Sequence, residues 1–63
     1  MKIPNWVLRC DGEYFGGFAA GGDIQCVARS EYAMTFISFG TAQQFAHELE
    51  ELTGERWEVA SAG

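Results

Sequence analysis

The chain has 63 residues and a formal net charge of −5, so we expect one small domain, residues 1–63, with a limited core. Much of that core must come from two Trp, two Tyr and five Phe residues, because each aromatic side chain buries about 150–250 Å². A domain of this size has little room for a catalytic cleft, and its acidity argues against direct binding to nucleic acid or to a membrane. We therefore expect neither an enzyme nor a cofactor.

The cysteines and the absence of an apolar run indicate a cytoplasmic protein. No segment is apolar enough to span a membrane, and the first residues lack the pattern of a secretory signal. Cys10 and Cys26 are expected to be reduced and to face the core, since small secreted domains usually carry several disulfides. A structural zinc site needs about four ligands and His47 is the only histidine, so no metal site is expected.

A β-hairpin is predicted at residues 5–18. Asp11-Gly12 separates two alternating segments, and this dipeptide favours a type I′ turn because both central residues need positive φ. The pair Gly16-Gly17 predicts a bulge or room for the Trp6 indole. Alternation places the following residues on the core face: Trp6, Leu8, Cys10 and Phe15. It places these on the other face: Val7, Arg9, Tyr14 and Phe18.

The middle of the chain is less regular. Residues 24–28 form a predicted short strand, residues 29–32 a polar connection with a helical turn, and residues 33–38 another strand or extended segment. The Gly-rich run 16–23 is followed neither by Lys-Ser/Thr nor by a predicted helix, so it is interpreted as turns rather than as a phosphate-binding loop.

The clearest predicted element is a helix over residues 41–52. Thr41 and Gln44 have capping-box spacing, whereas Ser38 with Thr41 gives an alternative start that includes Phe39. Gly54 favours a helix end. Helical periodicity places these residues on one apolar face: Ala42, Phe45, Ala46, Leu49 and Leu52.

A last strand is predicted over residues 55–60, with Trp57 and Val59 on one face. The order of elements predicts an α+β fold, with a three- to four-stranded, mainly antiparallel sheet and one helix packed on one face. The opposite face is then exposed unless something binds it.

Acidic residues concentrate around the end of the predicted helix. Like charges repel, and carboxylates near a helix C-terminus oppose the helix dipole, so stability alone does not favour them. Two interpretations remain open: a solvated face, or a binding surface for a basic protein. His47, one turn before Glu50 and Glu51, is interpreted as a solvated side chain. The candidate acidic binding residues are Glu48, Glu51, Glu55 and Glu58.

The aromatic residues exceed what one helix on one sheet face can cover. Tyr14 and Tyr32 are candidate anchors for a partner, and Phe18 is a further residue of the uncovered side. Alternatively, these side chains close the edges of the core, or they form the interface of a homodimer.

The pattern Ala33-x-x-Phe36-x-Ser38, continued by a Phe45-Ala46 helix and the strand Trp57-Glu58-Val59, resembles very short accessory proteins of phages and mobile elements, including small anti-CRISPR proteins. The resemblance covers roughly the C-terminal half. It implies an inhibitor in a bacterial host cell that blocks a basic nucleic-acid-binding surface of a CRISPR effector complex, sometimes in place of DNA. The alternative is a small structural or regulatory homo-oligomer without an effector target.

Overall fold

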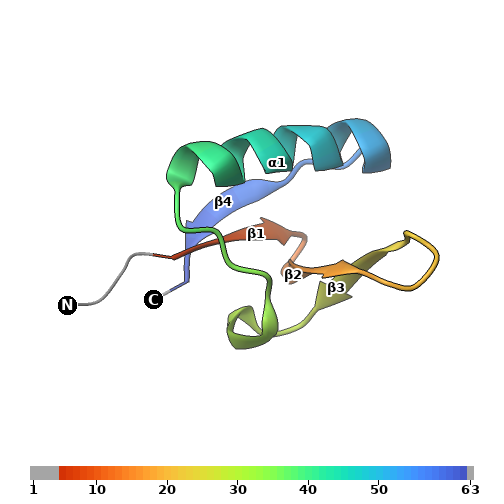
Figure 1. The fold of residues 1–63 in the computed structure, drawn as a ribbon, viewed down its shortest axis with the longest axis horizontal. Coiled ribbons are helices and arrows are strands. Elements are labelled where there is room, and N and C mark those ends of the chain that lie inside the picture. Colours follow the sequence, from red (N-terminus) through yellow and green to blue (C-terminus); the bar gives the residue numbers. More distant parts are fainter. Residues whose placement is uncertain (1–4, 63) are drawn as a thin grey trace.

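The computed structural model describes residues 5–62, which form one antiparallel sheet and one helix (Figure 1). The strands follow the order β3-β2-β1-β4 in the sheet, and every neighbouring pair is antiparallel. The predicted α+β fold is therefore confirmed. The elements are β1 (Trp6–Cys10), β2 (Glu13–Phe18), β3 (Ile24–Val27), the 3₁₀ helix η1 (Ser30–Tyr32), α1 (Phe39–Thr53) and β4 (Glu58–Ser61).

The hairpin of β1 and β2 turns at Asp11-Gly12, as the sequence predicts. Asp11 has a φ of 49° and Gly12 a φ of 81°, so both central residues are left-handed. Cys10 lies opposite Glu13 across the turn. This two-residue turn matches the right-handed twist of the strands that it joins.

A bulge in β2 changes the face on which its last residue lies. The register with β3 shifts between Phe15 and Gly17, where Gly17 has a φ of 118°. The predicted bulge is confirmed, but the prediction that Phe18 points away from the core is wrong. One extra residue reverses the alternation, and the Phe18 ring centroid lies 5.4 Å from that of Phe15.

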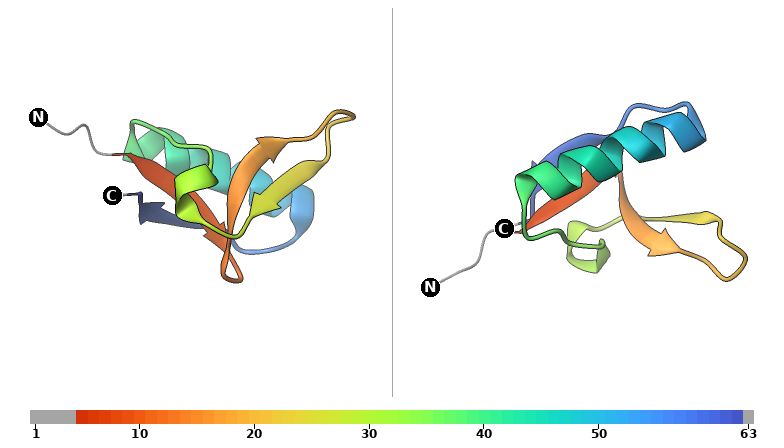
Figure 2. Two further views of the ribbon diagram at one scale, coloured as in Figure 1. Left: turned by 90° about the horizontal axis from the view of Figure 1, so that it is seen from below. Right: turned by 45° about the horizontal axis from the view of Figure 1, so that its top comes forward.

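The sheet opens beyond the first hairpin. Two bonds of 2.8 Å join the backbones of Trp6 and Phe36, and Met34 N donates to Phe15 O at 2.9 Å. The segment 34–36 thus bonds to both strands where they separate, and the β2–β3 hairpin diverges from β1 and β4 (Figure 2). The strand predicted over residues 33–38 is reduced to one isolated bridge, because no neighbour continues its ladder.

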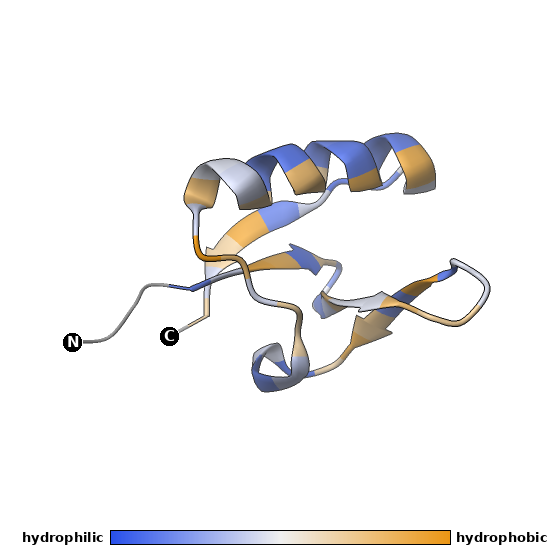
Figure 3. Cartoon of the chain, in the orientation of Figure 1, coloured by the Kyte–Doolittle hydropathy of each residue, from blue (hydrophilic) through white to orange (hydrophobic). Residues whose placement is uncertain are grey.

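The helix begins at the alternative start that the sequence offered. Ser38 is the N-cap, and its Oγ accepts a bond from Thr41 N, so α1 includes Phe39 rather than starting at Thr41. Gly54, with a φ of 74°, ends the helix and donates its N–H to Glu50 O. Figure 3 shows the polar outer face and the apolar inner face of α1.

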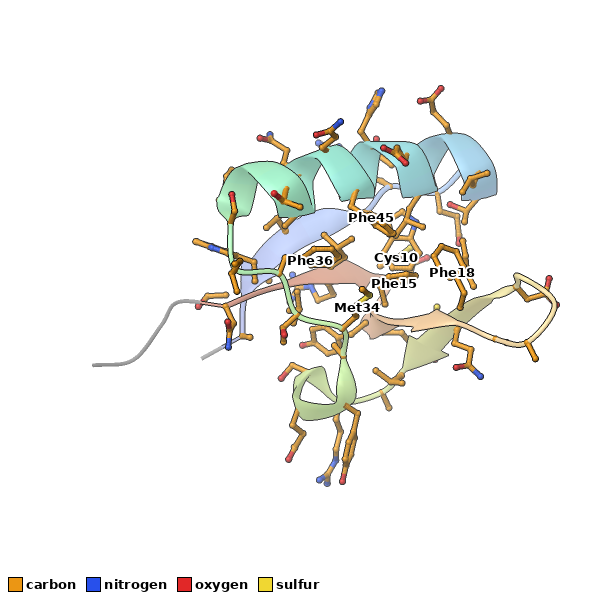
Figure 4. All side chains as sticks on the ribbon, in the orientation of Figure 1. Cys10, Phe15, Phe18, Met34, Phe36 and Phe45 are labelled. Carbon is orange, nitrogen blue, oxygen red and sulfur yellow. The ribbon has the colours of Figure 1, made fainter. Side chains whose placement is uncertain are left out.

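The core lies between α1 and the sheet. The Phe15 ring occupies its centre, with centroids 5.3 Å from Phe45 and 6.2 Å from Trp57 (Figure 4). Because aromatic pairs at these distances add to the energy of burial, a few rings stabilise a small core. The buried residues of this cluster are Leu8, Cys10, Phe15, Phe36, Ala42, Ala46, Leu49 and Trp57.

The face of the sheet opposite α1 is partly covered by the chain itself. Val7 alternates with Leu8 and so points away from the helix, yet it is fully buried. The loop that contains η1 lies on that side of β1 (Figures 1 and 2), and we attribute the burial of Val7 to it. The expectation that Val7 lies on an exposed face is therefore wrong.

Candidate functional site

Acidic side chains from distant parts of the chain meet beside the end of α1. Carboxylate oxygens of Asp11 and Glu55 and the Sγ atom of Cys10 all lie within 4.8 Å of one another. Asp11 and Glu55 are 44 positions apart, so helical spacing could not reveal their proximity. We use the name acidic end for this pair together with Glu13, just after the hairpin turn, and Glu48 and Glu51, in the last two turns of α1.

A hydrogen-bonded turn fixes the backbone of the acidic end. Thr53 Oγ1 donates to Leu49 O at 2.7 Å, and it accepts bonds of 3.1 Å from Glu55 N and from the indole Nε1 of Trp57. Glu50 Oε2 accepts a further bond of 3.1 Å from Trp57 N. These bonds also explain why β4 begins at Glu58 rather than at residue 55, since they occupy the backbone of the preceding residues.

The acidic end has a negative potential from two sources, its own carboxylates and the dipole of α1. No basic residue lies in the last turn of α1, whose terminal carbonyls carry the negative end of the helix dipole. Glu51 lies 3.5 Å from His47, and both side chains are exposed, so solvent screens this contact. A cationic group on a partner would complement the charges at this surface.

The two thiols near the acidic end are held in their protonated form. Burial, followed by the carboxylates of Glu55 and Asp11, raises the pKa of Cys10. Partial desolvation, followed by Glu13 and Glu55, raises the pKa of Cys26. Since the thiolate is the nucleophile and the metal ligand, these shifts disfavour both roles near neutral pH.

Cys26 is exposed, contrary to the prediction that both cysteines face the core. It lies opposite Phe15 in the register, but β3 is the outer strand of the sheet and α1 packs over β1 and β4. The helix therefore does not cover Cys26. Cys10, on β1, is buried as predicted.

The acidic residues predicted to bind a partner do not form one surface. Glu48, Glu51 and Glu55 are exposed and belong to the acidic end. Glu58 instead forms an ion pair of 3.3 Å with Arg9 on the face of the sheet away from α1. It lies directly opposite Arg9 in the register of the two strands.

The two predicted aromatic anchors lie away from the acidic end. Tyr14 is half-buried and is paired with Arg9 across β1 and β2. Tyr32 is 69% exposed and belongs to η1 on the same side of the sheet. The six predicted residues therefore divide between the acidic end and the opposite face.

Exposed apolar side chains lie on the flank of α1 that faces β2. Phe18 is 51% exposed, and its ring centroid is 6.3 Å from that of Phe45. Leu52 follows Phe45 by two helical turns and is 71% exposed. We name these three residues the apolar patch; Figure 4 shows Phe18 directed toward Phe45.

The exposure of Leu52 corrects its assignment to the core face of the helix. A helix of 15 residues extends about 22 Å, whereas the five-residue strand β1 extends about 17 Å. The end of α1 consequently projects past the strands on which it packs. Helical periodicity shows which face of α1 carries Leu52. It does not show that the sheet ends before it reaches that residue.

Within residues 5–62, no helix combines the length and apolarity needed to cross a membrane. Comparisons of the chain with family models, curated proteins and solved structures found no match.

Proposed function

We propose that this chain is a non-enzymatic protein-binding module whose acidic end engages a basic surface of a partner. The observation that supports this most strongly is the approach of Asp11 and Glu55 across the fold, beside a helix whose last turn has no basic residue. The arrangement costs stability, because it adds repulsion and opposes the helix dipole. A basic partner would remove the cost and associate faster through charge complementarity.

The apolar patch supplies contact area beside this charge. Phe18 and Leu52 expose most of their side chains to solvent, and Phe45 joins them on the flank of α1. Interfaces are commonly anchored by a few apolar or aromatic residues surrounded by polar groups. The proposed partner surface therefore combines Lys or Arg residues with an apolar side chain that packs on Phe18.

The sharper form of the proposal is an inhibitor of anti-CRISPR type. A protein surface that binds nucleic acid is basic, and a chain with a net charge of −5 complements it. The resemblance of the C-terminal half to short phage proteins supports this form. The partner is then a nucleic-acid-binding subunit of a CRISPR effector complex in a bacterial host.

Affinity capture with charge-reversed variants tests the proposal. The immobilised chain is exposed to bacterial lysate at low and high salt, and retained proteins are identified. The variant Glu48→Lys/Glu55→Lys is compared with Asp23→Lys/Glu31→Lys, whose side chains are also exposed. Each pair changes the net charge from −5 to −1 (two reversals, each adding 2), so only the position of the charge differs.

We expect the acidic-end variant to bind the captured partner at least about tenfold more weakly, and the control variant to bind nearly as the wild type does. Equal losses in both variants would show that net charge alone drives retention, and would refute a specific site. The inhibitor form also predicts that the chain lowers the affinity of its partner for DNA. Unchanged DNA binding in the complex would refute that form alone.

Self-association is a second candidate function, and the exposure of Phe18 and Leu52 is the observation that favours it. A homodimer that packs two apolar patches together would remove these side chains from water. Sedimentation of the wild type and of Leu52→Glu distinguishes the candidates. A wild type that stays monomeric at high concentration excludes the homo-oligomer.

A further inference from the structure

The outer edge of β4 presents backbone groups that β1 does not use. Ala62 N donates to Asn5 O at 2.9 Å, so residues 5 and 62 form a hydrogen-bonded pair of the ladder between β1 and β4. Because bonded and non-bonded pairs alternate in an antiparallel ladder, Val59 and Ser61 direct their N–H and C=O groups away from β1. β4 is the last strand of the sheet, so within residues 5–62 these four groups lie on a free edge.

A carboxylate already occupies the next outward position on this edge. Like Val59 and Ser61, Trp57 directs its backbone N–H away from β1, and this N–H donates to Glu50 Oε2 at 3.1 Å. The side chain of Glu50 thus acts as a strand partner would, at the point where β4 begins. The stretch left for an added strand runs from Val59 to Ser61.

A groove accompanies the free edge, because α1 runs alongside β4 (Figures 1 and 2). Its volume is about 370 Å³, and Phe39, 46% exposed, forms part of its apolar wall. A second hollow, lined by residues 50 and 54–56, shares Glu50 and Arg56 with it and extends toward the acidic end. The groove is lined by Phe39, Gln43, Ala46, His47, Glu50, Arg56, Trp57, Glu58 and Val59.

We propose that the outer edge of β4 is a strand-addition site for an extended basic segment of a partner protein. The backbone of that segment exchanges hydrogen bonds with Val59 and Ser61. Every second side chain enters the groove, where apolar residues pack on Phe39 and Val59. A Lys or Arg residue at one end of the segment reaches Glu50 and Glu55.

The charge of the lining favours this occupant. The carboxylates at the two hollows are those of Glu50 and Glu55 against the single guanidinium of Arg56, because the carboxylate of Glu58 pairs with Arg9 on the other face of the sheet. A second copy of the chain would instead bring a net charge of −5 against −5. The sign of the partner's charge rests on the proposed function, whereas the free edge and the groove do not.

Peptide titration followed by NMR tests the site on the intact chain. The probe is a capped peptide of about seven alternating Lys and Val residues, which can form one added strand. Ser61→Pro removes one outward N–H, and proline is tolerated where the N–H of an edge strand faces solvent. Ser61→Ala is the matched control, because it removes the hydroxyl and keeps the N–H group.

We expect the peptide to shift the amide signals of Val59 and Ser61 and to slow their hydrogen exchange. Ser61→Pro should bind the peptide at least about fivefold more weakly, while Ser61→Ala binds as the wild type does. A peptide with alternate N-methylated amides should fail to bind, which tests the same bonds without altering the protein. Equal affinity of Ser61→Pro and Ser61→Ala, or full binding of the methylated peptide, would overturn the proposal.

The variants Ser61→Pro and Glu48→Lys/Glu55→Lys separate a failure of strand addition from a failure of the proposed function. If Ser61→Pro keeps full affinity for the captured partner while Glu48→Lys/Glu55→Lys loses it, strand addition is wrong and the acidic binding module stands. Equal binding of an alternating Glu and Val peptide would refute the basic occupant. A dimer that Ser61→Pro dissociates would assign the edge to a second copy and refute the partner segment.

Discussion

Reversing the charge of Glu55 should stabilise the fold. At 4.8 Å in water, the repulsion between Asp11 and Glu55 amounts to about 0.9 kcal/mol, and Glu55→Lys turns it into an attraction. Screening at physiological salt roughly halves the change of about 1.8 kcal/mol, and both side chains are exposed. A lysine beside the C-terminus of α1 adds about 0.3–1 kcal/mol. We therefore expect a net gain of about 1–2 kcal/mol in the free energy of unfolding.

Thermal unfolding followed by circular dichroism measures this gain. For a domain of this size, 1 kcal/mol raises Tm by about 4–8 °C. Glu55→Gln, which removes the repulsion without adding a cation, should give about half the shift, and high salt should reduce both shifts. Gln44→Lys is the control, because it adds a positive charge on the exposed face of α1 far from its last turn. A Glu55→Lys variant that melts at or below the wild-type temperature at low salt would refute the electrostatic account of the acidic end.

Three further predictions concern the hydrogen-bonded turn, the thiols and the bulge. Thr53→Val should lower the free energy of unfolding by about 1–3 kcal/mol and alter Trp57 fluorescence, since the indole N–H loses its partner; an unchanged denaturation midpoint would contradict this. Iodoacetamide at neutral pH should modify the exposed Cys26 before the buried Cys10. The rate of modification should rise with pH, because the raised pKa of each thiol leaves little thiolate at neutral pH. Modification of Cys10 before Cys26 would contradict the described burial. Gly16→Ala should destabilise the fold in chemical denaturation, because the added Cβ would lie 2.9 Å from Val27 Cγ1; a neutral effect would show that the Val27 side chain can move aside.

The local elements were predictable because short-range chemistry determines them. Asp11-Gly12 specifies its turn through the backbone φ angles that the two residues tolerate. Ser38 and Gly54 satisfy the ends of α1, although the sequence also offered Thr41 as the start. A bulge at Gly16-Gly17 was one of two expectations, but its effect on Phe18 was not foreseen, because the sequence left open whether the pair forms a bulge or only makes room for the Trp6 indole.

The candidate site was only partly predictable, because it depends on long-range contacts. Glu48, Glu51 and Glu55 follow from helical spacing. Asp11 joins them only because the hairpin turn meets the end of the helix in three dimensions. Glu58 was expected beside them, but strand pairing places it opposite Arg9. The exposure of Leu52 depends on where the sheet ends, which no local pattern records.

The pairing of β1 with β4 also affects how the chain folds during synthesis. Arg9 and Glu58 are neighbours in the sheet but lie 49 positions apart, so β1 gains this partner strand only after the whole segment between them has been made. At about 5–20 residues per second, the ribosome needs about 2–10 s to produce that segment. During this interval Val7 and Leu8, which are fully buried in the folded chain, belong to a strand whose edge toward β4 is unpaired. A chaperone that binds extended apolar segments would compete with β4 for β1 once β1 has left the ribosome.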